Sequence, residues 1–410
     1  MPGGPRFPLH IVHLILQHFN GGRWFSVERP TLICCSLVCR AWRDIAQALL
    51  YKNVNLWTHE RFDLFRDFVH ANPRIAAAVR ELLFQVSFCE DLYQLPPSLL
   101  LEILEALPNI RCLELEGVTL LGWPAYNALP PEPFKLSKLM LTDVQNGPYF
   151  NRHCLRFDFL RLFTEIDELQ VVGSVEDEEV AGKVTASRRG IPPPIVRKLV
   201  IAGPDSILDY NDKCGGLNKE HLRALQVDVS DKVSLRYAGK MLRRYGENMR
   251  DLDLDLCTAV AQVKPKDTRL WKGLEAGKLS RVERLTLHIR DHGRATEWTV
   301  EQADQEFCKA YGAVLSAIPS GTLRELKWAL PGPRDEEAFS SSARCLAPLL
   351  LQAVEKFPTL ETITLVLWRE LPFERCTAAL HSMLPEKVLQ RDVIRLEKWT
   401  SKYIGQFTVD

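Results

Sequence analysis

The sequence predicts a mixed α/β chain: a short helical domain followed by a long solenoid of stacked strand–helix repeats. Two observations predict this fold class. Apolar residues recur at helical spacing between residues 7 and 52. From residue 79 onward, the pattern apolar-x-x-apolar-x-apolar occurs ten times, with successive starts 26 to 41 residues apart. Because one strand and one helix cannot bury their apolar faces alone, repeated units of this kind stack on one another.

The helical domain is expected at residues 7–52, after a loose start at 1–6. Pro8 suits a first helical turn, and Pro30 stands where a second helix can begin. Two or three helices in about 45 residues cannot bury two apolar faces by themselves. Part of this apolar surface is therefore expected to contact a partner or the following domain.

The solenoid is expected at residues 53–383. Segments 99–107 and 346–357, which precede Pro108 and Pro358, have the spacing of helices between the strands. Residues 384–410 are expected to form a helical cap, because an open solenoid end exposes its core. The strands are predicted at 79–84, 110–115, 136–141, 166–171, 196–201, 222–227, 249–254, 282–287, 323–328 and 360–365.

Composition excludes several classes of partner. The chain has 52 basic and 52 acidic residues, so its net charge gives no steering towards nucleic acid or anionic lipid. No segment approaches the ~18 consecutive apolar residues of a membrane span. Eleven cysteines occur without C-x-x-C or zinc-ligand spacing, which is typical of reduced thiols. We therefore expect a cytoplasmic or nuclear protein that contacts neither nucleic acid nor membrane.

Catalytic and cofactor motifs are absent from the sequence. H-E-x-x-H, G-x-S-x-G, the P-loop and G-x-G-x-x-G do not occur. Asp251, Asp253 and Asp255 would place three carboxylates on one strand face. An EF-hand would need glycine and glutamate where Leu256 and Gln262 stand. We therefore expect a protein that is not an enzyme and that has no metal site and no cofactor.

Residues 7–12 (FPLHIV) and 35–42 (CSLVCRAW) resemble an F-box of the variant common in fungal proteins. The chain departs from that pattern at Phe7, where the family usually has leucine, and the resemblance covers about a tenth of its length. It implies docking onto the Skp-type linker subunit of an SCF ubiquitin ligase, and through it onto a cullin scaffold. The alternative is a plain helical cap in which Trp42 packs inward. The implied linker-binding residues are Pro8, Leu9, Ile11, Leu37, Val38, Cys39 and Trp42.

The repeats resemble degenerate leucine-rich repeats of the long strand–helix type, which implies a ribonuclease-inhibitor-like horseshoe. The family's Asn or Cys after the last strand leucine is replaced in most repeats, for example by Val118 and Val144, and only Cys257 fits. In this fold the leucines point into the core and the residues between them face the concave surface. That face would carry Glu114, Met140, Gln170, Val200, Gln226, Asp253, Thr286, Lys327 and Thr364 in one column.

A mixed-charge patch on this concave face suits recognition of a protein or peptide segment; the alternative is a solvated face without a ligand. Aspartates of two repeats would adjoin Arg284 and His288 of the next repeat. The polar loops 175–194 and 259–278 either contact a partner or are tolerated insertions. The candidate target-binding residues are Asp228, Asp251, Asp253, Asp255, Arg284, His288 and Lys327.

Three hypotheses for the function follow. The first is a non-catalytic, substrate-recognition adaptor of an SCF-type E3 ubiquitin ligase in the ubiquitin-like conjugation pathway. The second is a leucine-rich-repeat scaffold whose F-box-like cap does not serve ubiquitin transfer. The third is an enzyme built on a parallel β-helix, which would have shorter repeats without helices.

Overall fold

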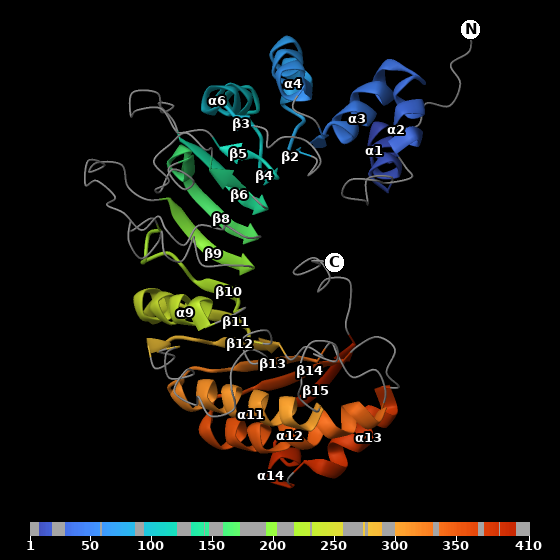
Figure 1. Ribbon diagram of the computed structural model, residues 1–410. Coiled ribbons are helices and arrows are strands. Elements are labelled where there is room, and N and C mark those ends of the chain that lie inside the picture. The colour runs from blue at the N-terminus through green and yellow to red at the C-terminus, as the bar shows by residue number, and fades with distance from the viewer. Residues whose placement is uncertain are drawn as a thin grey trace, which may run out of the picture. The chain divides into compact units, whose positions relative to one another are not determined.

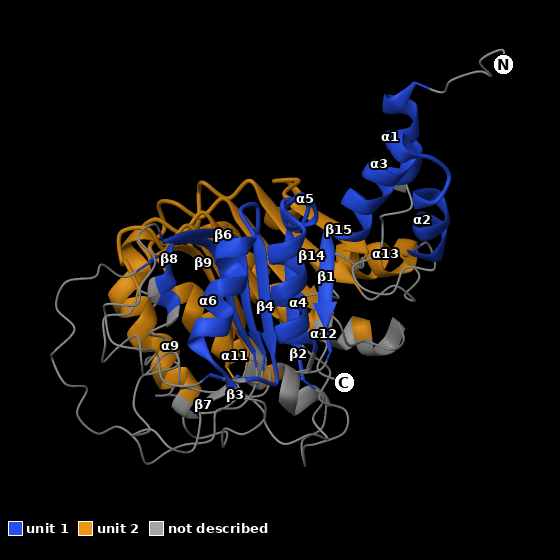
Figure 2. Ribbon diagram, turned by 90° about the horizontal axis from the view of Figure 1, so that it is seen from above, with its two compact units in different colours: residues 1–194 blue, residues 195–410 orange. Residues whose placement is uncertain are grey.

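The structure, a computed structural model, divides into two compact units, residues 1–194 and 195–410, and each is described by itself (Figure 2). The sequence indicated no boundary inside the expected solenoid at 53–383. Phe7, Cys257 and most of the loops 175–194 and 259–278 lie outside the described residues. The structure describes residues 8–18, 29–57, 60–86, 94–120, 133–142, 144–146, 159–172, 194–202, 217–229, 232–256, 274, 278–288, 300–330, 336–367, 373–384 and 386–398.

The first unit begins with the helices α1 (Leu9–His18), α2 (Arg29–Ser36) and α3 (Arg40–Leu50). The apolar pattern after Pro30 is divided between α2 and α3, and at the end of α2 the Ser36 hydroxyl donates to the Ile33 carbonyl, 2.7 Å away. Cys39 is fully extended, with φ −161° and ψ 170°, and starts α3. The break leaves Leu37 and Val38 in a turn between the two helices.

These three helices share a small core. Val12 and Leu16 of α1, one helical turn apart, are at most 1% exposed. Leu32 of α2 and Ala46 and Leu49 of α3 complete the cluster, and Cys35, Trp42, Ile45 and Leu50 pack against it.

Parallel strands follow one another in chain order in the rest of the first unit. They are β1 (Asn53–Leu56), β2 (Glu81–Gln85), β4 (Cys112–Glu116), β6 (Phe134–Thr142) and β8 (Phe163–Val172). The helices α4 (Glu60–Ala71) and α6 (Pro97–Ala106) pack side by side (Figure 2). The short segments α5 (Pro73–Ala76) and η2 (Phe159–Leu162) precede β2 and β8, and β3 (Gln94–Leu95), β5 (Thr119–Leu120) and β7 (Gln145–Asn146) form a second small sheet.

The second unit repeats the same arrangement. Its parallel strands are β9 (Ile195–Ala202), β10 (Ala224–Asp228), β11 (Asp251–Asp255), β12 (Arg284–His288), β13 (Glu325–Leu330), β14 (Thr362–Leu367) and β15 (Ile394–Lys398). Its helices are α9 (Lys232–Tyr245), α11 (Val300–Ala317), α12 (Glu336–Lys356), α13 (Phe373–Met383) and α14 (Glu386–Leu389), with the 3-10 turn η3 (Gly246–Asn248). The helices α11 and α12 pack together on one side of the strands (Figure 1).

The register of the strands confirms all ten predicted strand positions. In the first unit Leu82, Leu113, Leu139 and Leu169 pair in one row. In the second unit Leu199, Leu225, Leu252, Leu285, Leu326 and Ile363 form the corresponding row. Each of these side chains is at most 1% exposed, so each row is a continuous strip of core within its unit. The described units are therefore strand–helix repeats with parallel strands.

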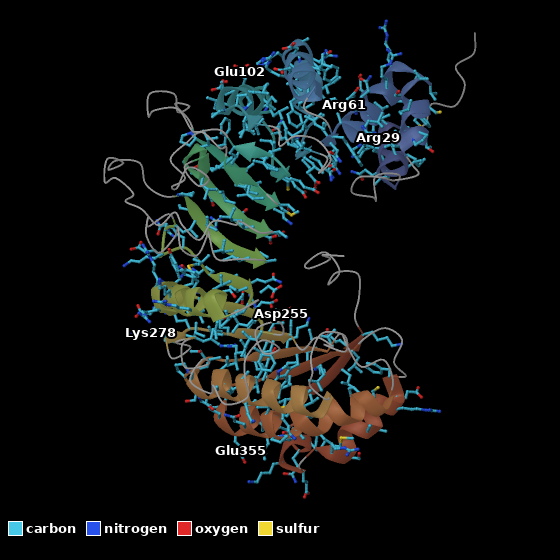
Figure 3. All side chains as sticks on the ribbon, in the orientation of Figure 1. Arg29, Arg61, Glu102, Asp255, Lys278 and Glu355 are labelled. Carbon is cyan, nitrogen blue, oxygen red and sulfur yellow. The ribbon has the colours of Figure 1, made fainter. Side chains whose placement is uncertain are left out.

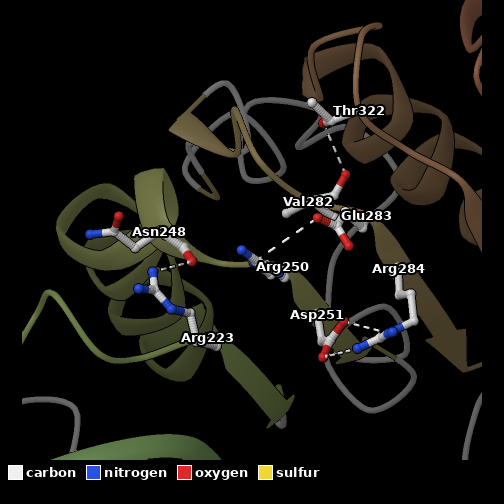
Figure 4. A network of polar contacts seen from close by, with 8 residues as sticks. All are labelled: Arg223, Asn248, Arg250, Asp251, Val282, Glu283, Arg284 and Thr322. Atoms are coloured by element: carbon white, nitrogen blue, oxygen red, sulfur yellow. Dashed lines mark hydrogen bonds and ion pairs between the residues drawn. The ribbon is translucent and has the colours of Figure 1, made fainter.

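Hydrogen bonds link neighbouring repeats at the turns before the strands (Figure 4). Arg223 Nη1 donates to the Asn248 carbonyl, 3.2 Å away, and Thr322 Oγ1 donates to the Val282 carbonyl, 3.0 Å away. The Arg250 backbone N–H donates to the Arg223 carbonyl at 2.7 Å, and the next repeat continues this backbone ladder. These bonds satisfy the carbonyls of each turn.

One expectation is wrong in part. The end of the array is not a helical cap alone, because β15 pairs with β14 as a further strand. Ile394 and Leu396 alternate there with Arg395 and Glu397, which is the period of a strand and not of a helix. The helices that connect the strands also differ from the shorter, helix-free repeats of a parallel β-helix, as the helical segments in the sequence indicated.

The two faces of a strand differ in what they contribute to stability. Leu285→Ala removes a side chain that is 1% exposed and leaves a cavity, so we expect the unfolding free energy to fall by about 2–5 kcal/mol. Thr286→Ala changes a half-buried neighbour on the opposite face, and we expect a loss below about 1 kcal/mol. Urea unfolding of the full chain measures both. Equal losses would contradict the assignment of the two faces.

Candidate functional site

The first candidate site is an apolar surface on the N-terminal helices. Leu37, Val38 and Leu9 are 73%, 64% and 56% exposed, although they adjoin a well-packed core. We define the helical-bundle apolar surface by its six large exposed side chains: Leu9, Leu14, Ile15, Ile33, Leu37 and Val38.

This surface follows from the sequence of α1 and α2. Each helix turns one face to the shared core, with Val12 and Leu16 from α1 and Leu32 from α2. The remaining large apolar residues of these helices lie outside this core. A helix that is apolar on most of its circumference is normally buried on most of it. The surface therefore has the composition of an interface rather than of a solvated face.

The sequence-predicted linker-binding residues divide into two groups. Pro8, Leu9, Leu37, Val38 and Cys39 are exposed, and Ile11 is half-buried. Trp42 is also half-buried and packs against the core of the three helices, so it serves the fold in part. Sequence reasoning missed Leu14, Ile15 and Ile33. The sequence of α1 indicated the exposure of Leu14 and Ile15, because this helix has more apolar residues than one helical face holds.

The second candidate site is the strand face of the second unit on which charged residues alternate with core leucines. The predicted column is confirmed within each unit: Glu114, Met140 and Gln170 pair across β4, β6 and β8, and Val200, Gln226, Asp253, Thr286, Lys327 and Thr364 pair from β9 to β14. Exposure changes along the column of the second unit, which begins at Val200, 3% exposed. Gln226 is only 2% exposed, whereas Lys327 and Thr364 are half-buried.

The predicted contacts of Asp251 with Arg284 and of Asp253 with His288, between β11 and β12, are confirmed. Arg284 Nη2 donates to Asp251 Oδ2 at 2.6 Å, and Arg284 Nε lies 2.5 Å from Asp251 Oδ1 (Figure 4). The two residues are direct cross-strand partners. The guanidinium therefore lies close to both carboxylate oxygens and donates one charge-assisted hydrogen bond, which is stronger than a bond between neutral groups. The hydrogen bond with Asp251 is the main reason that the pKa of Arg284 is raised, so the guanidinium stays charged through the physiological pH range.

His288 extends this network towards the carboxyl ends of the strands. Its Nε2 lies 2.7 Å from Asp253 Oδ1, and its side chain is 8% exposed. The Tyr311 hydroxyl of α11 donates to the His288 carbonyl. Asp255 is the direct cross-strand partner of His288 and is 1% exposed (Figure 3).

These contacts decide which charges face solvent. Asp251 and Asp253 are engaged by Arg284 and His288, and Asp255 is buried. Asp228 and Lys327 are half-buried, at opposite sides of the paired residues. Much of the predicted target-binding patch is therefore an internal cross-strand network, and a ligand would meet chiefly Arg284, Lys327 and the outer edge of Asp251.

Potential metal ligands are dispersed in the described part of the chain. Among those residues no three potential metal ligands gather. The first unit has a shallow hollow on its strands, lined by Glu81, Leu82, Cys112, Leu113, Glu114, Lys138 and Met140. Lys138 of this hollow pairs with Glu168, 3.4 Å away, on the next strand.

Comparison with known proteins adds no family: no protein-family model matches the chain, and no curated protein is significantly similar to it. Across the described ranges, every helix is too short or too polar to cross a lipid bilayer.

The Asp251–Arg284 pair should be energetically coupled. Its side chains are 32% and 54% exposed, so solvent screening limits the coupling in a double-mutant cycle to about 0.5–1 kcal/mol. Urea unfolding of the full chain, of Asp251→Asn, of Arg284→Gln and of the double variant measures it. Additive losses would show that the pair contributes no net attraction.

Proposed function

We propose that this chain is the substrate-recognition subunit of an SCF-type ubiquitin ligase. The helical-bundle apolar surface, which we assign to an F-box, would dock onto a Skp-type linker and through it onto a cullin. The strand–helix repeats, which we assign to degenerate leucine-rich repeats, would hold the target protein. The chain itself would perform no chemical step.

The exposure of Leu9, Leu37 and Val38 is the observation that carries this proposal. Burying a leucine side chain contributes about 1.5–3 kcal/mol, so six exposed apolar side chains hold a large association energy that the isolated chain does not use. A partner that covers them supplies the missing burial. The resemblance of FPLHIV and CSLVCRAW to an F-box favours a Skp-type linker as that partner.

The mechanism is proximity. A target bound to the repeats is held near a ubiquitin-loaded enzyme on the same cullin, which raises the effective concentration of its lysines. The adaptor needs a rigid connection and selective binding, and no acid, base or nucleophile of its own. The continuous core rows within each unit are suited to such a rigid support.

The turn between α2 and α3 offers the sharpest test. Leu37→Ser combined with Val38→Ser removes two apolar anchors that the fold does not bury, so we expect linker affinity to fall at least about thirtyfold, or about 2 kcal/mol. Thermal unfolding should be almost unchanged. Isothermal titration calorimetry with a purified Skp-type linker measures the affinity.

Leu64→Ser is the matched control. Leu64 lies on α4, outside the helical bundle, and is 67% exposed, close to the exposure of Val38. This variant should bind the linker with unchanged affinity. Equal binding by the Leu37/Val38 variant and this control would contradict the proposed docking surface.

Trp42 should contribute both to the stability of the chain and to its affinity for the linker. It is half-buried against the helical core, so Trp42→Ala should cost about 1–3 kcal/mol of stability, less than the 3–5 kcal/mol of a fully buried tryptophan. Its remaining surface lies among the implied linker contacts, so affinity should fall as well. Calorimetry measures the linker affinity of the variant, and thermal unfolding of the same sample measures its stability. If both are retained, Trp42 is neither a linker contact nor a core residue.

A further inference from the structure

The strand β15 of the second unit has an open edge that the proposed function does not use. Within the described residues it pairs with β14 on one side, and no strand follows on the other (Figure 1). On β14 the core side chains Ile363 and Leu365 are 0% exposed. Their partners on β15, Ile394 and Leu396, are only half-buried. An edge of this kind is a template for pairing with a further strand.

The hydrogen bonds to β14 fix which backbone groups of β15 face outward. The Ile363 N–H donates to the Val393 carbonyl at 2.8 Å, so the backbone groups of Val393 point to β14. Successive residues of a strand direct their N–H and C=O groups to alternate sides. The backbone groups of Ile394, Leu396 and Lys398 therefore point to the open edge.

The preceding repeat holds the start of this edge in place. Arg391 Nη1 donates to the Val354 carbonyl at 2.7 Å. Its Nη2 donates to the Pro358 and Leu360 carbonyls, each 3.2 Å away. Asp392 then turns the chain into β15 with a φ of 49°. An edge whose geometry is fixed before association loses less conformational entropy when a second strand binds to it.

The charges of β15 select a second copy of the same strand as its partner. The strand reads IRLEK, and Arg395 and Glu397 are exposed on either side of Leu396. In an antiparallel pair centred on Leu396, Arg395 of each copy lies opposite Glu397 of the other. Centring the pair on Arg395 or on Glu397 sets like charges opposite each other, which is destabilising. The strand is therefore complementary to itself in the register centred on Leu396.

The same register joins the outward backbone groups and covers the exposed end of the core. Leu396 faces its equivalent across the two-fold axis, and Ile394 faces Lys398, whose aliphatic stem covers apolar surface. Glu397 also has an interaction within its own chain, and a carboxylate accepts several donors, so the two contacts are compatible. We propose that β15 pairs antiparallel with β15 of a second copy, which makes the chain a homodimer independently of the linker.

Sedimentation velocity of the full chain tests this proposal. A pair of five-residue strands buries less than about 1,200 Å², so we expect a weak dimer with a dissociation constant of about 10–100 µM. Arg395→Glu sets like charges opposite each other at two symmetric positions, so the dissociation constant should rise at least about tenfold at low salt. A chain that stays monomeric up to about 200 µM would overturn the proposal.

A mixture of two variants separates self-pairing from effects on the fold. Arg395→Glu and Glu397→Arg should each be monomeric alone, because each sets like charges opposite each other in its own dimer. Mixed together, they again have opposite charges at both positions, so they should form a heterodimer within about threefold of the original affinity. A mixture that does not associate would overturn the proposed register.

Arg344→Glu is the matched control, because it makes the same charge reversal at an exposed residue of α12. It should dimerise like the unmodified chain, and so should Leu37→Ser combined with Val38→Ser. Loss of the dimer in either control would overturn the assignment to β15, the second because it would place self-association on the helical-bundle apolar surface. If Arg395→Glu does not fold in thermal unfolding, Arg395→Gln, with an expected loss of about threefold, replaces it.

Discussion

The structure depends on one constraint: a strand and a helix of this chain cannot bury their apolar faces alone. Leu252 and Leu285 are buried because each strand lies beside the equivalent strand of the next repeat, in the same register. Because side chains alternate with a period of two, a shift by one residue would place the aspartates of β11 in the core. The leucine rows therefore fix the strand order within each unit, and with it which polar residues become neighbours across strands.

The same constraint gives the two candidate surfaces different characters. On the strands, the alternation of side chains brings Asp251 next to Arg284 and Asp253 near His288. These polar side chains, which the sequence suggests are available to a ligand, are therefore largely engaged with one another. On the N-terminal helices Leu37 and Val38 lie outside the strand rows and are exposed. The candidate surface on the N-terminal helices is thus apolar, and the candidate strand face is polar. The two surfaces are suited to partners of different chemistry.

Sequence periodicity predicted the strands well because each strand carries the same three apolar positions, and their burial is decided by the nearest repeats. It also predicted the cross-strand approach of Asp251 and Arg284, because the repeat fixes the register. Features that depend on local competition were not predictable from periodicity. The break at Leu37–Cys39 lies within a continuous apolar pattern, and the exposure of Leu14 and Ile15 follows from the small size of the helical core. The composition near residue 194 does not distinguish the boundary between the two units from an ordinary loop. β15 was not predicted because its alternating apolar segment is only five residues long.

Co-expression of residues 1–410 with a Skp-type linker, followed by size-exclusion chromatography with light scattering, tests the central claim most directly. The account predicts a stable one-to-one complex that is lost when residues 1–52 are deleted, while the remaining chain stays folded. A folded monomer that elutes apart from the linker would contradict it, and would leave a strand–helix repeat scaffold whose apolar helical surface serves another partner.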